Sequence, residues 1–537
     1  MWSMTVRALR AMATAVTAGA LLAGTAACSA PSEGDTASGA GDTLVVGIAQ
    51  EPDTLNPLLG YGKDGNSKVF DGLLRHDADM ELRPALAAEL PEVGNGGRTY
   101  TYTLREGVTF SDGTPFDAED VVFTYETILD EKTNNPSKGE LDALADVTAE
   151  DDHTVVFELK YPYAAFAERT VLPIVSKEAF EGQDVNAGSH NTEPVGTGPY
   201  VLTGWSKGEK LVFEANPDYW GGAPKVRKLT MAIIKDDDIR ATRLRSGELD
   251  AAILPPVLAD TFAKDGREAG KRVIRAKTAD FRAVTLPTAN PVTGDRAVRR
   301  ALDIAVDREA IVKSVLNGAG RAAYGPVPTD SPWFAKGTER RHDPERAKEI
   351  LDEAGWKPGQ DGVRRKDGRR AAFTLWYPSG DRLRQEHALA YAADAKKIGI
   401  DITVESGTWE VIEPRMEDDA VLSGGGSPAD PDFDLYSLLH SSLALDGFNN
   451  MAAYDNPAVD RALEEGRRAG DRDDRAEAYA TVQRELAENP GYTFLTHVDH
   501  VYVMDDAWED ITTQVEPHDH GFGTGPWWNV EDWRPKR

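Results

Sequence analysis

The sequence predicts a multidomain protein of the α/β class, with strands and helices mixed in an α+β arrangement. The chain has 537 residues, of which 40% are hydrophobic, and this is enough for about three domains of roughly 150 residues each. Strand-like and helix-like segments alternate through most of the chain, and no repeat of roughly 20–50 residues interrupts them. The single cysteine excludes an internal disulfide, so core packing must stabilise the fold.

The expected strands are short runs of apolar, β-branched and aromatic residues. The clearest run covers 99–104, where Tyr100, Tyr102 and Leu104 alternate with threonine. Because side chains alternate between the two faces of a strand, these three residues are expected on one buried face. Other runs predict strands at 44–48, 154–159, 200–202, 211–214, 229–234, 373–377 and 400–405.

Helices are predicted where a capping residue precedes apolar residues at helical spacing. Asp117, with Asp120 three residues later, is typical of a helix N-terminus. Asp343 followed by Pro344 predicts a second start, and Gly355 predicts the end of that helix. Further helices are expected over 295–316 and 382–397. The first helix should bury a stripe formed by Val121, Val122, Tyr125, Ile128 and Leu129.

The N-terminal segment has the composition of a secretory signal. Basic residues precede an apolar stretch over 11–27, and small residues lead to Cys28. A cysteine in this context resembles the lipobox of bacterial lipoproteins, in which the thiol is acylated and becomes the new N-terminus. The resemblance implies a signal peptide at 1–27, a lipid anchor on Cys28 and a flexible tether at 28–43. We therefore expect an extracytoplasmic protein, anchored by lipid to the outer face of the membrane or in the periplasm.

The acidic balance of the chain narrows the classes of partner. The formal net charge is −30 at pH 7, whereas binding to nucleic-acid phosphates needs a basic surface. Nucleic acid is therefore not an expected partner, and self-repulsion between copies is consistent with a monomer. After residue 28, no apolar run is long enough to span a bilayer.

A series of short strings covers almost the whole remaining chain in a fixed order. The longest is YTYTLREGVTFSDGTPFDAEDVVFTY over 100–125, which we interpret as a strand, a turn and a capped helix. The other strings include EPDTLNP at 51–57, VFDGLL at 69–74, RPALA at 83–87, VGTGPY at 195–200, NPDYW at 216–220, SGELD at 246–250 and VRRAL at 298–302. The series resembles the extracytoplasmic solute-binding proteins of peptide, dipeptide and nickel ABC transporters, known as solute-binding protein family 5.

The resemblance implies a periplasmic-binding-protein-like fold, in which two lobes close on a ligand about a hinge and a third lobe is inserted into the first. It places lobe I at 44–75, 185–290 and 497–537, lobe II at 76–184 and lobe III at 291–496. It also implies no cofactor, and partnership with the permease and ATPase subunits of an ABC importer. The expected ligand is a short peptide or peptide-like solute, and a nickel or other metal chelate is the alternative within the family.

Part of the implied ligand site falls on the segment 424–432. Peptide binders of the family hold the peptide amine with an aspartate shortly before an Asp-Pro pair, which here is Asp430-Pro431. In this register the position is Ser427, so a neutral hydroxyl stands where a charge-assisted partner is expected. Asp430 or Asp432 could replace that charge, or could serve only to cap a turn.

Three further residues are candidate ligand contacts. Trp409 resembles the aromatic position that walls the ligand pocket in the family, and an aromatic face can cover a side chain or a cation. Tyr61 and Asn66 lie in a Gly-rich loop, 59–66, in a region that lines the cleft in relatives. Core packing of the tryptophan and a solvated loop are the structural alternatives.

The sequence predicts neither a metal site nor a catalytic site. Two of the histidines near the C-terminus, His518 and His520, share a Gly-rich loop. No third metal ligand lies at a fixed spacing from them, so no metal site is predicted. The acidic run at 430–434 lacks the glycine and glutamate that a calcium loop requires. No G-x-S-x-G, H-E-x-x-H or P-loop motif is present, which favours a binding protein over a secreted hydrolase, with an adhesin or sensor as a third class. The four histidines near the C-terminus that were considered as metal ligands are His497, His500, His518 and His520.

Overall fold

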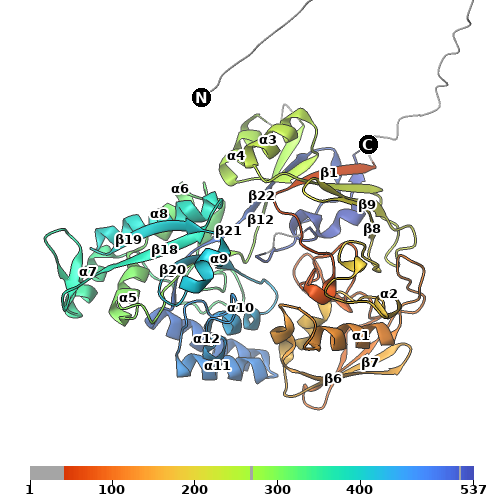
Figure 1. Ribbon diagram of the computed structural model, residues 1–537, viewed down its shortest axis with the longest axis horizontal. Coiled ribbons are helices and arrows are strands. Elements are labelled where there is room, and N and C mark those ends of the chain that lie inside the picture. Colours follow the sequence, from red (N-terminus) through yellow and green to blue (C-terminus); the bar gives the residue numbers. More distant parts are fainter. Residues whose placement is uncertain (1–41, 266–269, 519–521, 537) are drawn as a thin grey trace, which may run out of the picture. The chain divides into compact units, whose positions relative to one another are not determined.

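Three larger β-sheets organise the part of the chain that the structure, a computed structural model, describes: residues 42–536 without 266–269 and 519–521 (Figure 1). The predicted signal peptide, Cys28 and most of the predicted tether lie outside these residues, as does His520. We call the regions built on the seven-stranded, four-stranded and six-stranded sheets lobe I, lobe II and lobe III.

Lobe I is built on a mixed sheet of order β12-β22-β11-β1-β10-β9-β8. Its central strand β1 (Thr43–Ile48) runs parallel to β10 (Lys228–Ile233) and to β11 (Ala251–Ile253). The strands expected near residues 44 and 229 are thereby confirmed. The other members are β8 (Tyr200–Ser206), β9 (Lys210–Ala215), β12 (Lys271–Ala276), β22 (His500–Asp505) and the helices α3 (Asp237–Ser246) and α4 (Pro256–Asp265).

Lobe II is built on the antiparallel sheet β4-β5-β7-β6, with helix α1 packed against β6 and β7. The predicted alternation in β5 is confirmed, because Tyr100 and Tyr102 are buried. The predicted cap is also confirmed: Asp117 Oδ1 accepts from a first-turn N–H at 2.8 Å, and Asp120 Oδ2 accepts from the Asp117 N–H at 3.0 Å. Leu129, expected in the buried stripe of α1, is exposed. The elements are β4 (Glu92–Gly94), β5 (Thr99–Thr103), α1 (Ala118–Leu129), β6 (Leu144–Asp151) and β7 (Thr154–Leu159).

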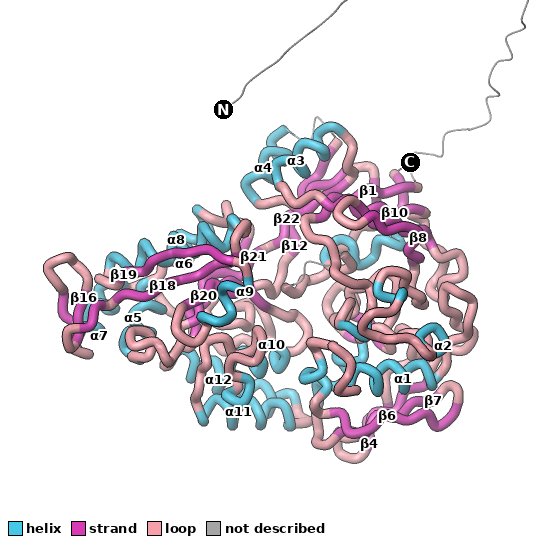
Figure 2. Tube along the Cα trace, viewed as in Figure 1, coloured by secondary structure: helices cyan, strands magenta, loops and turns pink. Residues whose placement is uncertain are grey.

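Lobe III is built on a sheet of order β14-β21-β13-β20-β18-β19, with helices around its strands (Figure 2). Helix α8 (Arg382–Lys397) has the predicted bounds, and α7 (Pro344–Glu353) follows the predicted cap, Asp343. Strand β13 (Phe281–Thr285) pairs with β20 and β21, so it belongs to this sheet, although the sequence analysis assigns residues up to 290 to lobe I. The other elements are β14 (Gly320–Ala322), β18 (Ala372–Pro378), β19 (Asp401–Gly407), β20 (Ala420–Gly425), β21 (Tyr492–Val498), α10 (Pro431–Leu439), α11 (Pro457–Arg468) and α12 (Arg472–Glu488).

The single helix expected over 295–316 is two helices, α5 (Arg296–Ala305) and α6 (Arg308–Ser314). Val306 has extended backbone angles (φ −77°, ψ 131°), which end the helical hydrogen bonding. Asp307 then caps α6, because its side chain accepts from a first-turn N–H at 3.0 Å. The prediction was wrong because the spacing of apolar residues continues across a short break, whereas the capping aspartate starts a new helix.

Shorter elements connect these regions. The short strands are β2 (Leu74–His76), β3 (Leu82–Pro84), β15 (Lys357–Pro358), β16 (Arg364–Lys366), β17 (Arg369–Arg370), β23 (Trp508–Glu509) and β24 (Arg534–Pro535). The short helices are α2 (Lys177–Phe180), α9 (Trp409–Ile412) and the 3₁₀ turns Pro57–Leu59, Lys138–Leu141, Ala164–Val171, Ser189–Asn191, Glu413–Arg415, Ser441–Leu443 and Gly525–Asp532.

Two crossings lead between the sheets of lobe I and lobe III in the described part of the chain. One is 277–280, between β12 and β13, and the other is Asp499, between β21 and β22 (Figure 1). The crossings are hydrogen-bonded to each other, because the Val498 N–H donates to Asp280 O at 2.8 Å and the Thr278 hydroxyl donates to Val498 O. A hinge between these lobes would therefore bend at these few residues.

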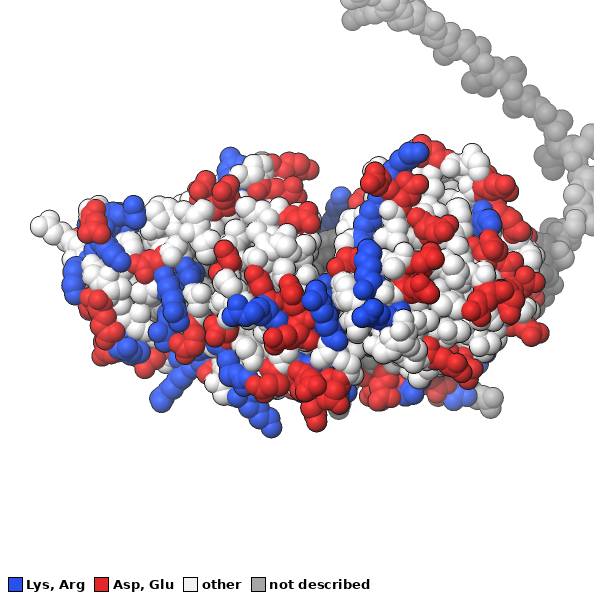
Figure 3. Space-filling view, turned by 90° about the horizontal axis from the view of Figure 1, so that it is seen from below, with Lys and Arg blue, Asp and Glu red and all other residues white. Residues whose placement is uncertain are grey.

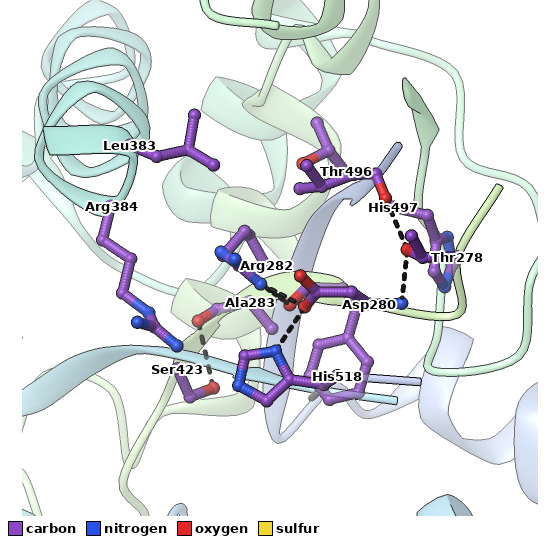
Figure 4. A network of polar contacts seen from close by, with 12 residues as sticks. Thr278, Asp280, Arg282, Ala283, Leu383, Arg384, Ser423, Thr496, His497 and His518 are labelled. Carbon is purple, nitrogen blue, oxygen red and sulfur yellow. Dashed lines mark hydrogen bonds and ion pairs between the residues drawn. The ribbon is translucent and has the colours of Figure 1, made fainter. Parts of the chain in front are cut away.

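A buried ionic cluster lies at the crossings (Figure 4). The Asp280 carboxylate is 1% exposed, Arg282 donates to it, and His518 Nδ1 lies 2.7 Å from it. His500 lies between two carboxylates, with Nε2 3.3 Å from Asp280 and Nδ1 2.7 Å from Glu516. Burial alone would lower the pKa of His500, but Glu516 and Asp280 outweigh burial and raise the pKa to about 10. The His500 imidazolium is thus charged at neutral pH and joins the crossing to the C-terminal segment.

Substitution of Gly198 by alanine should destabilise the protein, because an added Cβ would lie 2.5 Å from the Val69 carbonyl carbon. We expect the free energy of unfolding to fall by about 1–3 kcal/mol, the usual cost of forced overpacking. Denaturant unfolding of the Gly198→Ala variant measures the loss. Gly139→Ala is the matched control, since its position is exposed and nothing lies within 4 Å of the added Cβ. An unchanged Gly198→Ala midpoint would contradict this close approach.

Replacement of His500 by glutamine should weaken the protein in a pH-dependent way. The folded-state pKa of about 10 lies above the ordinary value of 6.5. The stabilisation is therefore complete below about pH 6.5 and disappears as the pH rises through about 10. His500→Gln should lower the free energy of unfolding by about 1.5–3 kcal/mol near pH 6, the range for hydrogen bonds to charged groups, and by much less near pH 10.5. Denaturant unfolding at both pH values measures the difference, and an equal loss at both would argue against an imidazolium.

Candidate ligand-binding site

Two cavities adjoin the segment Ser427–Ala429, which lines both of them together with Met80. The first has about 950 Å³ free of atoms, including the part open to solvent, and takes walls from all three lobes. The second has about 830 Å³ on the same measure and is walled mainly by lobe III and the first crossing. Because they share walls, we treat them as one site, the cleft. Its walls include Lys63, Asp71, Glu168, Arg169, Phe433 and Trp528 on the first side and Asp79, Lys277, Arg321, Asp330, Trp333 and Asp434 on the second.

The loop after β20 is positioned by the first crossing. Gly426 has a φ of +135°, in the region that favours glycine. A Cβ on Gly426 would collide with the Ala279 carbonyl oxygen, so the close approach itself requires glycine. The His518 N–H donates to Gly426 O at 2.6 Å. The loop that presents Ser427 to the cleft is thus packed on a crossing between the lobes.

Helix α10 begins with an aspartate cap and an ion pair. Asp430 Oδ1 accepts from the Asp432 N–H at 2.9 Å, and Pro431 occupies the first helical position. The same oxygen lies 2.7 Å from Arg475 Nη2, and both side chains are 8% exposed. Asp430 lines neither cavity. Its carboxylate therefore holds the start of the helix that follows the cleft loop.

The Asp432 carboxylate is fully buried and accepts from three side chains. Arg467 donates to it through Nε at 3.1 Å and Nη2 at 2.8 Å. Tyr479 donates at 3.1 Å, and Tyr163 donates at 2.8 Å. Because Tyr163 belongs to lobe II and Asp432 to lobe III, the last of these bonds links two lobes. In this arrangement Asp432 faces the lobe junction and lines neither cavity.

The third aspartate of this segment, Asp434, faces the second cavity and is a site residue that the sequence reasoning misses. Its Oδ2 accepts from the Ser427 N–H at 2.8 Å, and burial raises its pKa to about 7. Residues two apart on a helix point to opposite sides, so Asp432 turns to the core while Asp434 turns to the cleft. Reading Asp430 as the N-cap sets this helical phase and is the sequence signal that could have found Asp434.

Of the other predicted contacts, the structure places one in the cavity walls. Ser427 lines both cavities, whereas Trp409, Tyr61 and Asn66 line neither, although residues between the last two do. Trp409 packs edge-on against Phe448, with ring centroids 4.9 Å apart. Contact of these four residues with a ligand stays a prediction.

Most charged side chains in the cleft already have a partner of opposite charge. Lys68 Nζ lies 3.0 Å from Glu531, and Lys277 Nζ lies 2.8 Å from Asp330. The face drawn in Figure 3 likewise carries acidic and basic side chains side by side. A charged group that lacks such a pair is therefore informative about the ligand.

The histidines considered as metal ligands have internal partners where the structure describes them. His497 Nε2 lies 3.1 Å from the Pro326 carbonyl oxygen, and His500 and His518 belong to the Asp280 cluster. Between residues 42 and 536, outside the two gaps, no three His, Cys, Asp or Glu side chains are grouped as a metal site requires. Within the same residues, no helix combines the length and apolar character needed to cross a membrane.

Comparisons with known proteins show which family has this architecture. Residues 81–445 match the family model of bacterial extracellular solute-binding proteins, family 5 (middle). Protein XP55 of Streptomyces lividans is 63% identical over 510 residues, which cover 95% of this chain and 93% of that protein. NikZ from Campylobacter jejuni in complex with Ni(L-His) matches with a TM-score of 0.84 and 32% identity, over 92% of this chain and 99% of that one. The oligopeptide-binding protein AppA from Bacillus subtilis in complex with a nonapeptide matches with a TM-score of 0.79 and 26% identity, over 92% and 99%. The chain therefore belongs to the bacterial extracellular solute-binding proteins of family 5, which confirms the family resemblance and the mixed α/β fold inferred from the sequence.

Proposed function

We propose that this protein is the substrate-binding component of an ABC importer and that it captures a short peptide or peptide-like solute in the cleft. The observation that carries the proposal is a cleft walled by three lobes, in a chain of the solute-binding family. The AppA complex supports the ligand class, since a relative with this fold holds a nonapeptide. Two adjoining cavities also suit an elongated ligand, because it can extend on both sides of Ser427.

Capture would proceed by a shift between open and closed arrangements of the lobes, without covalent chemistry. Lobe II contacts lobe III through the Tyr163–Asp432 hydrogen bond. In addition, Arg467 Nη1 lies 3.6 Å from Asp142 Oδ2. A ligand that touches both lobes favours the arrangement with these contacts, and the permease would then recognise the loaded form.

A metal chelate is the second candidate ligand. NikZ, which is 32% identical, is complexed with Ni(L-His). The described residues offer no group of three metal-ligating side chains, so a metal would enter this cleft with its own organic ligand. Peptide and chelate share polar and charged groups that the same walls can recognise.

We assign direct ligand contact to Ser427, and a positioning role through α10 to Asp430 and Asp432. Trp409, Tyr61 and Asn66 would contact a ligand that extends beyond the two cavities. Trp409→Ala tests the first of these three: unchanged affinity for the ligand would remove Trp409 from the site. The family of solute-binding proteins to which the chain belongs supports binding without catalysis.

The test of the proposed function is native mass spectrometry of residues 29–537 purified from cells. A co-purified mass that fragments as a peptide supports the proposal. A mass that contains a metal and a chelator favours the second candidate. An empty protein that also retains nothing from a mixture of tri- to hexapeptides would overturn peptide capture.

Tyr163→Phe should weaken ligand binding, because it removes a hydrogen bond to Asp432 that exists only when lobe II meets lobe III. A hydrogen bond to a charged group contributes about 1.5–3 kcal/mol, so affinity should fall by at least about tenfold. Calorimetry with the peptide found by mass spectrometry measures the change. Tyr100→Phe is the control, since the Tyr100 hydroxyl donates to Tyr163 O within lobe II, at 2.9 Å. Equal affinities for Tyr163→Phe and wild type would refute a closing contact.

We also propose that the mature protein is tethered to the outer face of the membrane through lipid on Cys28 and acts there with permease and ATPase subunits. Cys28→Ser should release the protein into the soluble extracytoplasmic fraction. The variant has no thiol at position 28 to carry lipid, and stable anchoring depends on buried acyl chains. Cell fractionation and labelling with a radioactive fatty acid measure this. Retention of Cys28→Ser in the membrane fraction would speak against the lipid anchor.

A further inference from the structure

We propose that Asp434 binds a cationic group of the ligand, such as the protonated N-terminal amine of a peptide. This inference rests on the proposed function and names the chemistry at one wall of the cleft. The position expected to carry the amine-binding charge is Ser427, which is neutral. Asp434 is hydrogen-bonded to the backbone of that residue and lines the second cavity.

The Asp434 carboxylate lacks a cationic partner among the described residues. Its Oδ2 accepts from the Ser427 N–H at 2.8 Å, and no described Lys, Arg or His nitrogen lies within 4.0 Å of it. Asp430 and Asp432, on the same helix, each have an arginine within 2.8 Å. Since half-buried charge is costly without compensation, a ligand cation is the missing element.

The cations that lower the pKa of Asp434, Lys63 and Arg169, are paired with other groups. Lys63 Nζ lies 2.7 Å from Glu140 and 3.6 Å from Asp64. Arg169 also pairs with Glu140, and its guanidinium carbon lies 3.5 Å from the centre of the Phe433 ring. Asp64 adds negative charge. In the second cavity, Lys277 Nζ lies 2.8 Å from Asp330 and Arg321 Nε lies 3.2 Å from it. Asp79 adds a further carboxylate to that cavity. The wall around Asp434 therefore favours a cation in the cavity.

The pKa of Asp434 sets how such a contact would depend on pH. Burial raises the pKa of Asp434 to about 7, with Asp64 adding to the rise and Lys63 and Arg169 opposing it. An ammonium bound in the cavity would stabilise the ionised carboxylate through a charge-assisted hydrogen bond. The alternative is a purely structural role, in which Asp434 only holds the Ser427 loop and places negative charge at the start of α10.

The experiment compares unmodified tri- to hexapeptides with the same peptides after N-acetylation. Wild-type protein is equilibrated with each mixture, retained species are identified by mass spectrometry, and affinities are measured by calorimetry. We expect wild type to prefer the free amine by at least about tenfold, because one hydrogen bond between charged groups is worth more than about 1.4 kcal/mol. Asp434→Asn should lose this preference.

Two features of the design separate binding from structure. The amide oxygen of Asp434→Asn can still accept from the Ser427 N–H, so its thermal midpoint should stay near that of wild type. Asp473→Asn is the matched control, because Asp473 is an exposed carboxylate in the first turn of α12 that lines neither cavity, and it should leave the preference unchanged. As a second readout, wild-type affinity for free-amine peptides should fall more than about tenfold from pH 7.5 to 5.5 as Asp434 takes up a proton, whereas Asp434→Asn should show no such fall.

The possible outcomes separate the role of Asp434 from peptide capture by the protein. Loss of the amine preference in Asp434→Asn, but not in Asp473→Asn, supports the assignment. Equal affinity of wild type for free and acetylated peptides, or a preference that survives in Asp434→Asn, overturns the role of Asp434 and leaves peptide capture standing. Retention of neither mixture by wild type overturns peptide capture and the inference with it.

Discussion

The packing of a few residues at the two crossings is the constraint on which the rest of the structure depends. Asp280 is buried there with its charge compensated by Arg282 and by His500 of β22. His518 of the C-terminal segment contacts the same carboxylate at 2.7 Å, and burial lowers its pKa. Buried charge is tolerated only when such partners surround it, so these segments must stay together. The neighbouring Ala279 carbonyl leaves room only for glycine at position 426. Rotation at the crossings must therefore move the loop that presents Ser427 to the cleft.

Helix α10 shows how one short sequence is divided between fold and site. Asp430 and Asp432 face inward and are neutralised by arginines of α12 and α11, which fixes the helix in lobe III. Asp432 also accepts a hydrogen bond from Tyr163, so the carboxylate that holds the helix also bonds to lobe II. Asp434 points the other way, into the cleft. The cleft wall is thus supported from behind by ion pairs and carries a carboxylate on its open side.

Local patterns predicted the elements whose signals lie within a few residues of each other. The alternation in β5, the capping box of α1 and the bounds of α8 all follow from contacts between near neighbours in the sequence. The break at Val306 was missed because an interior aspartate and an N-cap aspartate look alike until the helix on either side is placed. The sheet to which β13 belongs also has no local signal, since β13 joins it through β20 and β21, which are distant in sequence.

The sequence by itself determined the family, the mixed α/β class and the segment on which the cleft loop falls, because these depend on ordered strings and on short-range periodicity. Only the tertiary structure decided the roles of the charged residues. An aspartate can be a helix cap, half of a buried ion pair or a carboxylate that lines the cleft. Which of these it is depends on partners that are distant in the sequence, such as Tyr163, which is 269 residues from Asp432. Spacing along the chain carries no record of those distant partners, whereas the folded chain brings them within hydrogen-bonding distance.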